Sequence, residues 1–124
     1  MSILPSDLKY TKSHEWFKID GDIATVGITD FAQHQLTDIV YVDMPKVGTS
    51  KKAGETLLTI ESVKSAEDVF FPVGGVVVET NMELDKKPEL INSDCYKYWL
   101  VKIKISDNKY DYMTAEEYKS YIGE

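Results

Sequence analysis

The chain has 124 residues, a length that supports one hydrophobic core, and its apolar fraction of 43% is ordinary for a globular protein. It carries 21 acidic residues against 14 basic ones, all of them lysines, which gives a net charge of −7. Because phosphate contacts supply most of the affinity for nucleic acids, an acidic chain without arginine argues against a nucleic-acid-binding protein. Such a surface suits basic protein partners.

Short apolar runs alternate with turn residues along the chain, a pattern typical of a mostly β protein. The runs that predict strands occupy residues 15–19, 23–28, 39–42, 57–60, 69–71, 76–78 and 99–105. Asp20-Gly21 separates the first two runs and predicts a hairpin with a type I′ turn. The last run alternates apolar residues with lysines, which predicts one apolar face made of Trp99, Val101, Ile103 and Ile105.

Short helices are expected beside these strands. Thr29 or Asp30 can cap a helix that follows the second strand. A helical or irregular piece is expected around residues 81–91. Thr114 and Glu117 have the T-x-x-E spacing of a capping box, which predicts a C-terminal helix.

A weak internal similarity is also visible. Gly48 is followed nine positions later by Leu57-Leu58, and Asn81 is followed nine positions later by Leu90-Ile91. As a repeat, this spacing predicts two similar β-units related by a pseudo-two-fold axis. The alternative is coincidence.

The sequence offers little raw material for catalysis. Cys95, His14 and His34 are the only candidates for nucleophilic chemistry, and Cys95 has no helix start or glycine-rich elbow that would activate a thiolate. The histidines lack the spacing of a metal site, and no glycine-rich phosphate-binding motif occurs. We therefore expect no catalytic residue and no metal ligand in this chain.

The location of the protein is constrained by its cysteine and its first residues. A single cysteine cannot form an internal disulfide, which fits a reducing compartment. The opening MSILPSDLKY resembles neither a secretory signal nor a presequence, and no apolar run is long enough to span a membrane. We expect a bacterial cytoplasmic protein, or a mitochondrial matrix protein if the sequence is a processed form.

The stretch ESVKSAED, residues 61–68, places Lys64 in a short polar turn between two predicted strands. By itself, an exposed lysine beside carboxylates is a protonated, unreactive side chain. It becomes a functional residue only as a site of covalent modification by another protein.

Further segments accompany this turn: YTKSHEW, VGITDFAQ, DIVYVDMPKVG and NMELDKKPELIN. In this order, from about Leu8 to Ile122, the chain resembles the H-protein family of the glycine cleavage system. The resemblance implies a hammerhead-like lipoyl-domain fold, a barrel-sandwich hybrid of two antiparallel sheets with short peripheral helices, in a single domain of residues 1–124. It also implies that Lys64 carries lipoic acid in amide linkage, as N6-lipoyllysine.

The resemblance further implies a non-catalytic, monomeric carrier of the aminomethyl group of glycine. A pyridoxal-phosphate glycine decarboxylase (P protein) would load this cargo, and a folate-dependent aminomethyltransferase (T protein) would remove it. Dihydrolipoamide dehydrogenase (L protein) would take the electrons, and a lipoate-attaching enzyme would modify the lysine. Ser13, Glu15 and Asp68 match family positions of a cleft that receives the loaded arm. Alternatively, Ser13 and Glu15 merely border the first strand.

Several positions depart from the family pattern. Gly is usual where Thr37 stands, Pro where Cys95 stands, and Gly before the tryptophan where Lys97-Tyr98 precede Trp99. If the family needs Gly at Thr37 for a positive φ, the turn here is changed or strained. These departures bear on partner docking more than on lipoylation. We expect Trp16 to be a core residue and assign no role to His14.

Two other functions compete with the glycine cleavage carrier. One is an H-like lipoyl relay, or donor, for other lipoyl enzymes, and the other is an unmodified binding module of the same fold. Biotin carriage is disfavoured because biotin carriers flank their lysine with methionines, whereas Val63 and Ser65 flank Lys64. A lipoyl domain of a 2-oxoacid dehydrogenase is disfavoured because the SHEW segment and the C-terminal helix lie outside that smaller pattern.

Overall fold

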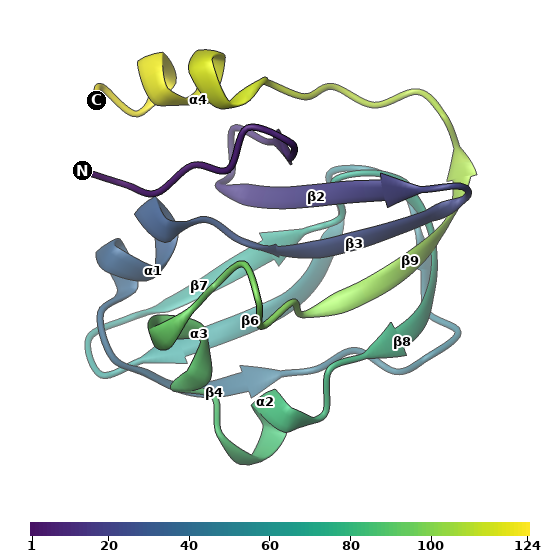
Figure 1. Cartoon of the computed structure of the whole chain (residues 1–124). Helices are drawn as coiled ribbons and strands as arrows, with labels where there is room; N and C mark the ends of the chain where they lie inside the picture. The colour runs from purple at the N-terminus through teal and green to yellow at the C-terminus, as the bar shows by residue number, and fades with distance from the viewer.

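The computed structural model describes all residues, 1–124, and shows two antiparallel sheets with short helices around them (Figure 1). The larger sheet has the strand order β1-β2-β3-β9-β8-β5 and the smaller one the order β4-β6-β7. The strands are β1 (Lys9–Tyr10), β2 (Glu15–Asp20), β3 (Ile23–Ile28), β4 (Ile39–Asp43), β5 (Ser50–Lys51), β6 (Thr56–Ser62), β7 (Ala66–Phe70), β8 (Gly74–Thr80) and β9 (Val101–Asp107). The helices are α1 (Asp30–Leu36), α2 (Glu83–Lys86), α3 (Leu90–Ser93) and α4 (Ala115–Tyr121). The predicted mostly β class, with peripheral helices, is confirmed.

The main core contains side chains from both sheets. In β3, Ala24, Val26 and Ile28 occupy alternate positions and are all buried, as expected for a strand with one face on the core. Val42, Ile60 and Val69 of the smaller sheet belong to the same cluster of 20 buried residues. Burial of these apolar faces holds the two sheets together.

A second, smaller cluster joins α4 to the first strands. It consists of Tyr10, Trp16 and Tyr118, and the rings of Tyr10 and Tyr118 stack with centroids 4.9 Å apart. Trp16 is 3% exposed, which confirms its prediction as a core residue. A Cβ atom at Gly27 would lie 2.5 Å from the Trp16 ring, so this strand position requires glycine.

The predicted caps of α1 and α4 are confirmed. The Thr29 hydroxyl accepts a hydrogen bond from the Ala32 amide at 3.2 Å. At α4, both bonds of the capping box between Thr114 and Glu117 are present.

The first hairpin is present, but its turn differs from the prediction. Asp20 pairs with Ile23, so the two loop residues are Gly21 and Asp22. Gly21 has a φ of 63°, whereas Asp22 is not among the residues with positive φ. This is the pattern of a type II′ turn, which needs glycine only at its first central position.

The predicted apolar face of the last strand is wrong at Trp99. β9 begins at Val101, and Trp99 packs against the second cluster, with the Lys102 ammonium 5.0 Å from its ring centroid. Leu100 and Val101 are both fully buried, so the alternation starts only inside the strand. Val101 and Ile103 belong to the main core, as predicted.

The internal similarity is not a structural repeat. Leu57-Leu58 lies in strand β6, whereas Leu90-Ile91 lies in helix α3. The prediction of two similar β-units from this spacing is therefore wrong.

Thr37, which ends α1, has a φ of 64° and a ψ of −140°. This confirms that the position takes a backbone conformation normally left to glycine. The Thr37 amide donates to the Gln33 carbonyl at 3.0 Å, and the Thr37 carbonyl accepts from the Asn92 side chain at 2.8 Å. These bonds hold a strained residue in place.

Candidate functional site

Lys64 lies in the turn between β6 and β7, and its side chain is exposed. The Ser62 hydroxyl organises this turn: it accepts hydrogen bonds from the Lys64 and Ser65 amides at 3.3 and 3.1 Å and donates to the Ser65 carbonyl at 3.2 Å. The Val63 amide donates to the Asp38 carbonyl at 3.0 Å. Neither ion pair of the structure involves Lys64. The backbone of the turn is fixed, and the amine is free.

A cavity of about 390 Å³ lies beside Lys64. We call it the arm cavity. Apolar side chains from α1 and from both sheets line it: Ile28, Phe31, Ala32, Leu36, Ile60 and Val69. Its volume lies within the usual range for small-molecule sites. A cavity with apolar side chains on part of its wall, beside a free lysine, has room for an acyl chain attached to that lysine.

Asp68 and Ser13, two of the predicted cleft residues, both line the arm cavity. Asp68 is exposed and accepts a hydrogen bond at 3.0 Å from the Thr59 hydroxyl, across the β6–β7 pair. Ser13 comes from the segment before β2, far from Asp68 in the sequence. The fold thus brings a hydroxyl and a carboxylate to the same cavity.

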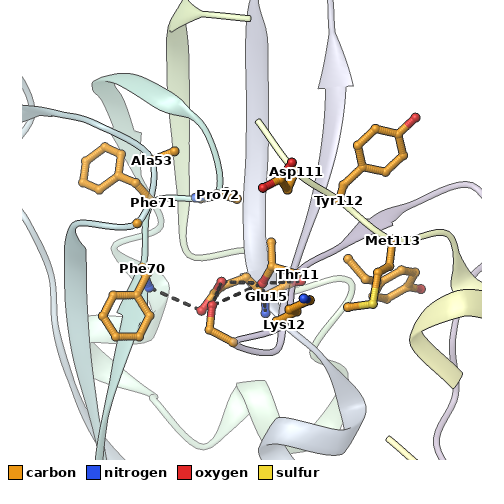
Figure 2. Close-up of a pocket in the computed structure, with 13 residues that line it drawn as sticks. Thr11, Lys12, Glu15, Ala53, Phe70, Phe71, Pro72, Asp111, Tyr112 and Met113 are labelled. Atoms are coloured by element: carbon orange, nitrogen blue, oxygen red, sulfur yellow. Dashed lines mark hydrogen bonds between the residues drawn. The ribbon is translucent and has the colours of Figure 1, made fainter. Parts of the chain in front are cut away.

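Glu15, the third predicted cleft residue, lies behind Ser13. Its side chain is 1% exposed, and its Oε1 accepts from the Thr11 hydroxyl at 2.5 Å (Figure 2). The Ser13 hydroxyl donates to the same oxygen at 2.6 Å. Oε2 of Glu15 accepts from the Phe70 amide at 3.3 Å. Burial raises the pKa of this carboxyl, while the hydrogen bonds from Ser13, Thr11 and Phe70 act in the opposite direction.

Glu15 lines a different cavity, of about 510 Å³, with aromatic residues such as Phe70 and Tyr112 around it (Figure 2). Ser13 also lines this second cavity, and it is the residue that the two cavities share. The structure therefore bonds Ser13 to Glu15 and places Ser13 and Asp68 on the wall of one cavity, but it does not place Glu15 beside Lys64.

His14, to which the sequence assigned no role, also lines the arm cavity. It is half-buried, its Nδ1 lies 2.8 Å from the Tyr118 hydroxyl, and its ring centroid lies 4.9 Å from that of Phe31. Burial lowers the pKa of the imidazole. The only feature of the sequence that could have predicted His14 as a cavity residue is its position between Ser13 and Glu15.

Cys95 is buried, and burial raises the pKa of its thiol to about 12. A buried thiol with a raised pKa is a packed side chain and not an activated nucleophile. The Cys95 carbonyl accepts a hydrogen bond from the Trp16 indole at 3.1 Å.

No cluster of three or more His, Cys, Asp or Glu side chains is arranged to hold a metal ion. None of the helices combines the length and the apolar character needed to cross a bilayer.

Comparison with known proteins decides the family. The family model described as "Glycine cleavage H-protein" matches residues 8–124. The chain belongs to this family.

Individual relatives agree with the family match. The probable glycine cleavage system H protein of Picrophilus torridus is 67% identical over 124 residues, which cover 100% of both chains. The glycine cleavage system H protein of Halothermothrix orenii is 50% identical over 98% of this chain and 97% of the relative. The crystal structure of such an H protein from Mycobacterium marinum superimposes with a TM-score of 0.91, at 35% identity, over 98% of this chain and 100% of that one. The predicted family and its two-sheet fold are confirmed.

Proposed function

We propose that this protein is the lipoyl carrier of the glycine cleavage system, with the lipoyl group on Lys64, acting as one domain of residues 1–124. It shuttles the aminomethyl group of glycine from the pyridoxal-phosphate decarboxylase to the folate-dependent aminomethyltransferase, and electrons to dihydrolipoamide dehydrogenase. Membership of the H-protein family supports this assignment. The chain supplies no catalytic residue in this scheme, because the difficult chemistry belongs to the cofactors of its partners.

The observation that carries the proposal is the exposed amine of Lys64 on a fixed turn beside the arm cavity. A lipoate-attaching enzyme needs access to a primary amine, and an exposed turn gives that access. When bound, the lipoyl group supplies a dithiol or disulfide at the end of a flexible tether. A tether turns collisions between separate proteins into repeated local encounters.

The charges around Lys64 fit an acylated lysine. Glu61, Glu67 and Asp68 are all exposed near the turn, and amide formation removes the positive charge among them. Glu67 and Asp68 line the arm cavity. A carboxylate there can pair with the ammonium of the cargo.

In this proposal Ser13 and Asp68, which both line the arm cavity, contact the cargo, and Glu15 acts on it by way of Ser13. A hydroxyl whose proton is donated to Glu15 presents its lone pairs to a cationic amine. The apolar side chains that line part of the cavity would limit the access of water to the carried group. This division of roles extends the predicted cleft of Ser13, Glu15 and Asp68.

The partners of this carrier are the decarboxylase, the aminomethyltransferase, the dehydrogenase and the lipoate-attaching enzyme. The acidic composition suits docking to basic protein surfaces. We place the carrier, as a monomer, in the compartment that holds these enzymes, the cytoplasm of a prokaryote or the mitochondrial matrix.

A reconstituted exchange assay tests the proposal. Lipoylated protein is incubated with the cognate decarboxylase, glycine and labelled bicarbonate, and the label that enters glycine is measured. We expect exchange with lipoylated wild type and none with Lys64→Ala. No exchange by fully lipoylated wild type would contradict the proposal and favour the lipoyl relay.

A further inference from the structure

A chain of hydrogen bonds connects α4 to the arm cavity. The Tyr118 hydroxyl lies 2.8 Å from His14 Nδ1 and 2.8 Å from the Thr29 hydroxyl. His14 belongs to the segment before β2, and Thr29 is the N-cap of α1. Both this segment and α1 line the arm cavity. Figure 1 shows α4 and α1 at the same end of the molecule.

The partners of Thr29 show which group donates and which accepts in each of these hydrogen bonds. Its hydroxyl is fully buried and accepts from the Ala32 amide, so its own proton can go only to Tyr118. The Tyr118 proton is then directed to His14 Nδ1. An imidazole that accepts at Nδ1 carries its proton on Nε2.

The second nitrogen of His14 is free. Nε2 makes no hydrogen bond to the protein, and no buried side-chain nitrogen or oxygen of the structure lacks a partner, so solvent reaches Nε2. An Nε2–H group on a residue that lines the arm cavity can donate to an acceptor of the arm, such as the amide carbonyl that acylation of Lys64 creates, whereas the ammonium of the cargo offers only donors.

The backbone of His14 is held in an unusual conformation. Its φ of 71° is one of two positive values among the non-glycine residues. The His14 amide donates to the Thr11 carbonyl at 3.1 Å, and the His14 carbonyl accepts from the Thr29 amide at 3.0 Å. Such strain persists only where the surroundings fix it, and it concentrates at functional sites.

We propose that Tyr118 is a positioning residue for the carried group, because its hydroxyl fixes His14 on the wall of the arm cavity as the neutral Nε2–H tautomer. This inference rests on the proposed function. The cargo carries an ammonium group, and a neutral imidazole adds no like charge beside it, whereas an imidazolium would repel it. Tyr118 is the residue through which α4 acts on the cavity.

Burial, and not the surrounding charges, favours a neutral imidazole, because carboxylates close to an imidazole favour its charged form. The charged side chains that share the arm cavity with His14 are Lys64, Glu67 and Asp68, and acylation removes the charge of Lys64. Its own segment adds the charged side chains of Lys12 and Glu15, and α4 contributes the phenol rings of Tyr118 and Tyr121. The α1 side chain packed on its ring is Phe31, while Asp30 and His34 lie 3.9 Å from each other. Burial lowers the pKa of His14 and raises the pKa of Tyr118 to about 12, so the tyrosine remains a donor.

Tyr118→Phe removes the hydroxyl and keeps the ring. Tyr121→Phe is the matched control: it lies on the same helix, and its hydroxyl donates to the Lys12 carbonyl at 3.2 Å, without a bond to His14. The first readout is the ¹⁵N chemical shifts of the His14 ring, measured by NMR with and without the lipoyl group. We expect the Nε2–H tautomer in wild type and in Tyr121→Phe, and a mixture of tautomers in Tyr118→Phe.

The second readout is cargo retention. The reduced arm is loaded by condensation with formaldehyde and ammonia, which needs no partner enzyme. Loss of cargo follows R–S–CH₂–NH₃⁺ + H₂O → R–SH + CH₂O + NH₄⁺, and ammonia is measured over time. We expect release about fivefold faster in Tyr118→Phe, the effect of one net hydrogen bond, and an unchanged rate in Tyr121→Phe.

Two results would overturn this inference and leave the proposed function standing. They are an Nδ1–H tautomer of His14 in wild type, and equal rates of ammonia release in wild type and Tyr118→Phe. The wild-type tautomer needs no variant, so the test holds even where Tyr118→Phe fails to fold. A wild type with the expected tautomer that accepts no lipoyl group would instead overturn the proposed function, and this inference with it.

Discussion

The Ser13 hydroxyl lies 2.6 Å from Oε1 of Glu15. Ser13 is also the residue common to the arm cavity and to the cavity shown in Figure 2. This hydrogen bond connects a fully buried carboxylate to the place where we propose that the cargo lies.

The first prediction concerns that carboxylate. Glu15→Ala leaves the donors of Thr11, Ser13 and Phe70 without an acceptor, so Glu15→Gln is the better variant because it removes the charge and keeps an oxygen. We expect ammonia release from the loaded carrier to rise about tenfold, the size of a lost charge-assisted hydrogen bond, with lipoylation intact. Ammonia release and intact mass are measured on the same samples.

Glu55→Gln is the control for this prediction. Glu55 is exposed and also accepts from a backbone amide, that of Lys52 at 2.8 Å, but it lines neither cavity. The rate of ammonia release from the Glu55→Gln variant should equal that from wild type. Equal rates in Glu15→Gln and wild type would rule out a role for Glu15 in retaining the cargo.

The second prediction is a pH dependence that originates at His14. Its pKa is lowered from 6.5 by burial in the folded protein, so the unfolded chain binds more protons between the lowered value and 6.5. The stability contributed by neutral His14 is therefore present above pH 6.5 and is lost as the pH falls through this window. We expect the free energy of unfolding of wild type to fall relative to that of His14→Asn as the pH decreases below 6.5.

Urea unfolding of both proteins at a series of pH values measures this difference. Asn is chosen because, among residues with a side chain, it is one of those that best tolerate the positive φ of this position. A difference that does not change with pH would show that burial does not depress the pKa of His14.

The third prediction concerns the strained end of α1. Thr37→Gly relieves a φ of 64° but gives the unfolded chain more freedom. Strain of this kind is worth about 1–3 kcal/mol, so we expect a net gain of about 1 kcal/mol in the free energy of unfolding, measured in urea.

Thr49→Gly is the control for the strain argument. The Thr49 hydroxyl donates to the Lys46 carbonyl at 2.6 Å, much as the Thr37 hydroxyl donates to the Leu36 carbonyl at 2.6 Å, but Thr49 has no positive φ. Thr49→Gly should destabilise the protein. If Thr37→Gly lowers the free energy of unfolding as much as Thr49→Gly does, the turn at Thr37 is not strained.

The features predicted correctly from sequence depend on local chemistry. The Lys64 turn follows from a polar stretch between two apolar runs, and the caps at Thr29 and Thr114 follow from short-range hydrogen bonding. The strands β1 and β5 were missed because two residues carry no periodicity.

The walls of the arm cavity could not be predicted in this way. Phe31 and Leu36 share a cavity with Lys64 because the fold brings α1 and the β6–β7 hairpin, distant parts of the sequence, to the same cavity. The family resemblance grouped Glu15 with Asp68, but it carried no information on burial. The register that buries Glu15 behind Ser13, and the contact of Tyr118 with His14, are products of the tertiary fold.

The central claim is that Lys64 is the amine that receives the lipoyl group. The most direct measurement is the intact mass of wild type, Lys64→Ala and Lys52→Ala after expression with lipoate and a lipoate-attaching enzyme. Lys52 is also exposed beside a turn, and it lies outside the arm cavity. We expect one lipoyl increment on wild type and on Lys52→Ala, and none on Lys64→Ala. A wild type that is never acylated, or a Lys64→Ala protein that keeps the increment, would contradict the account.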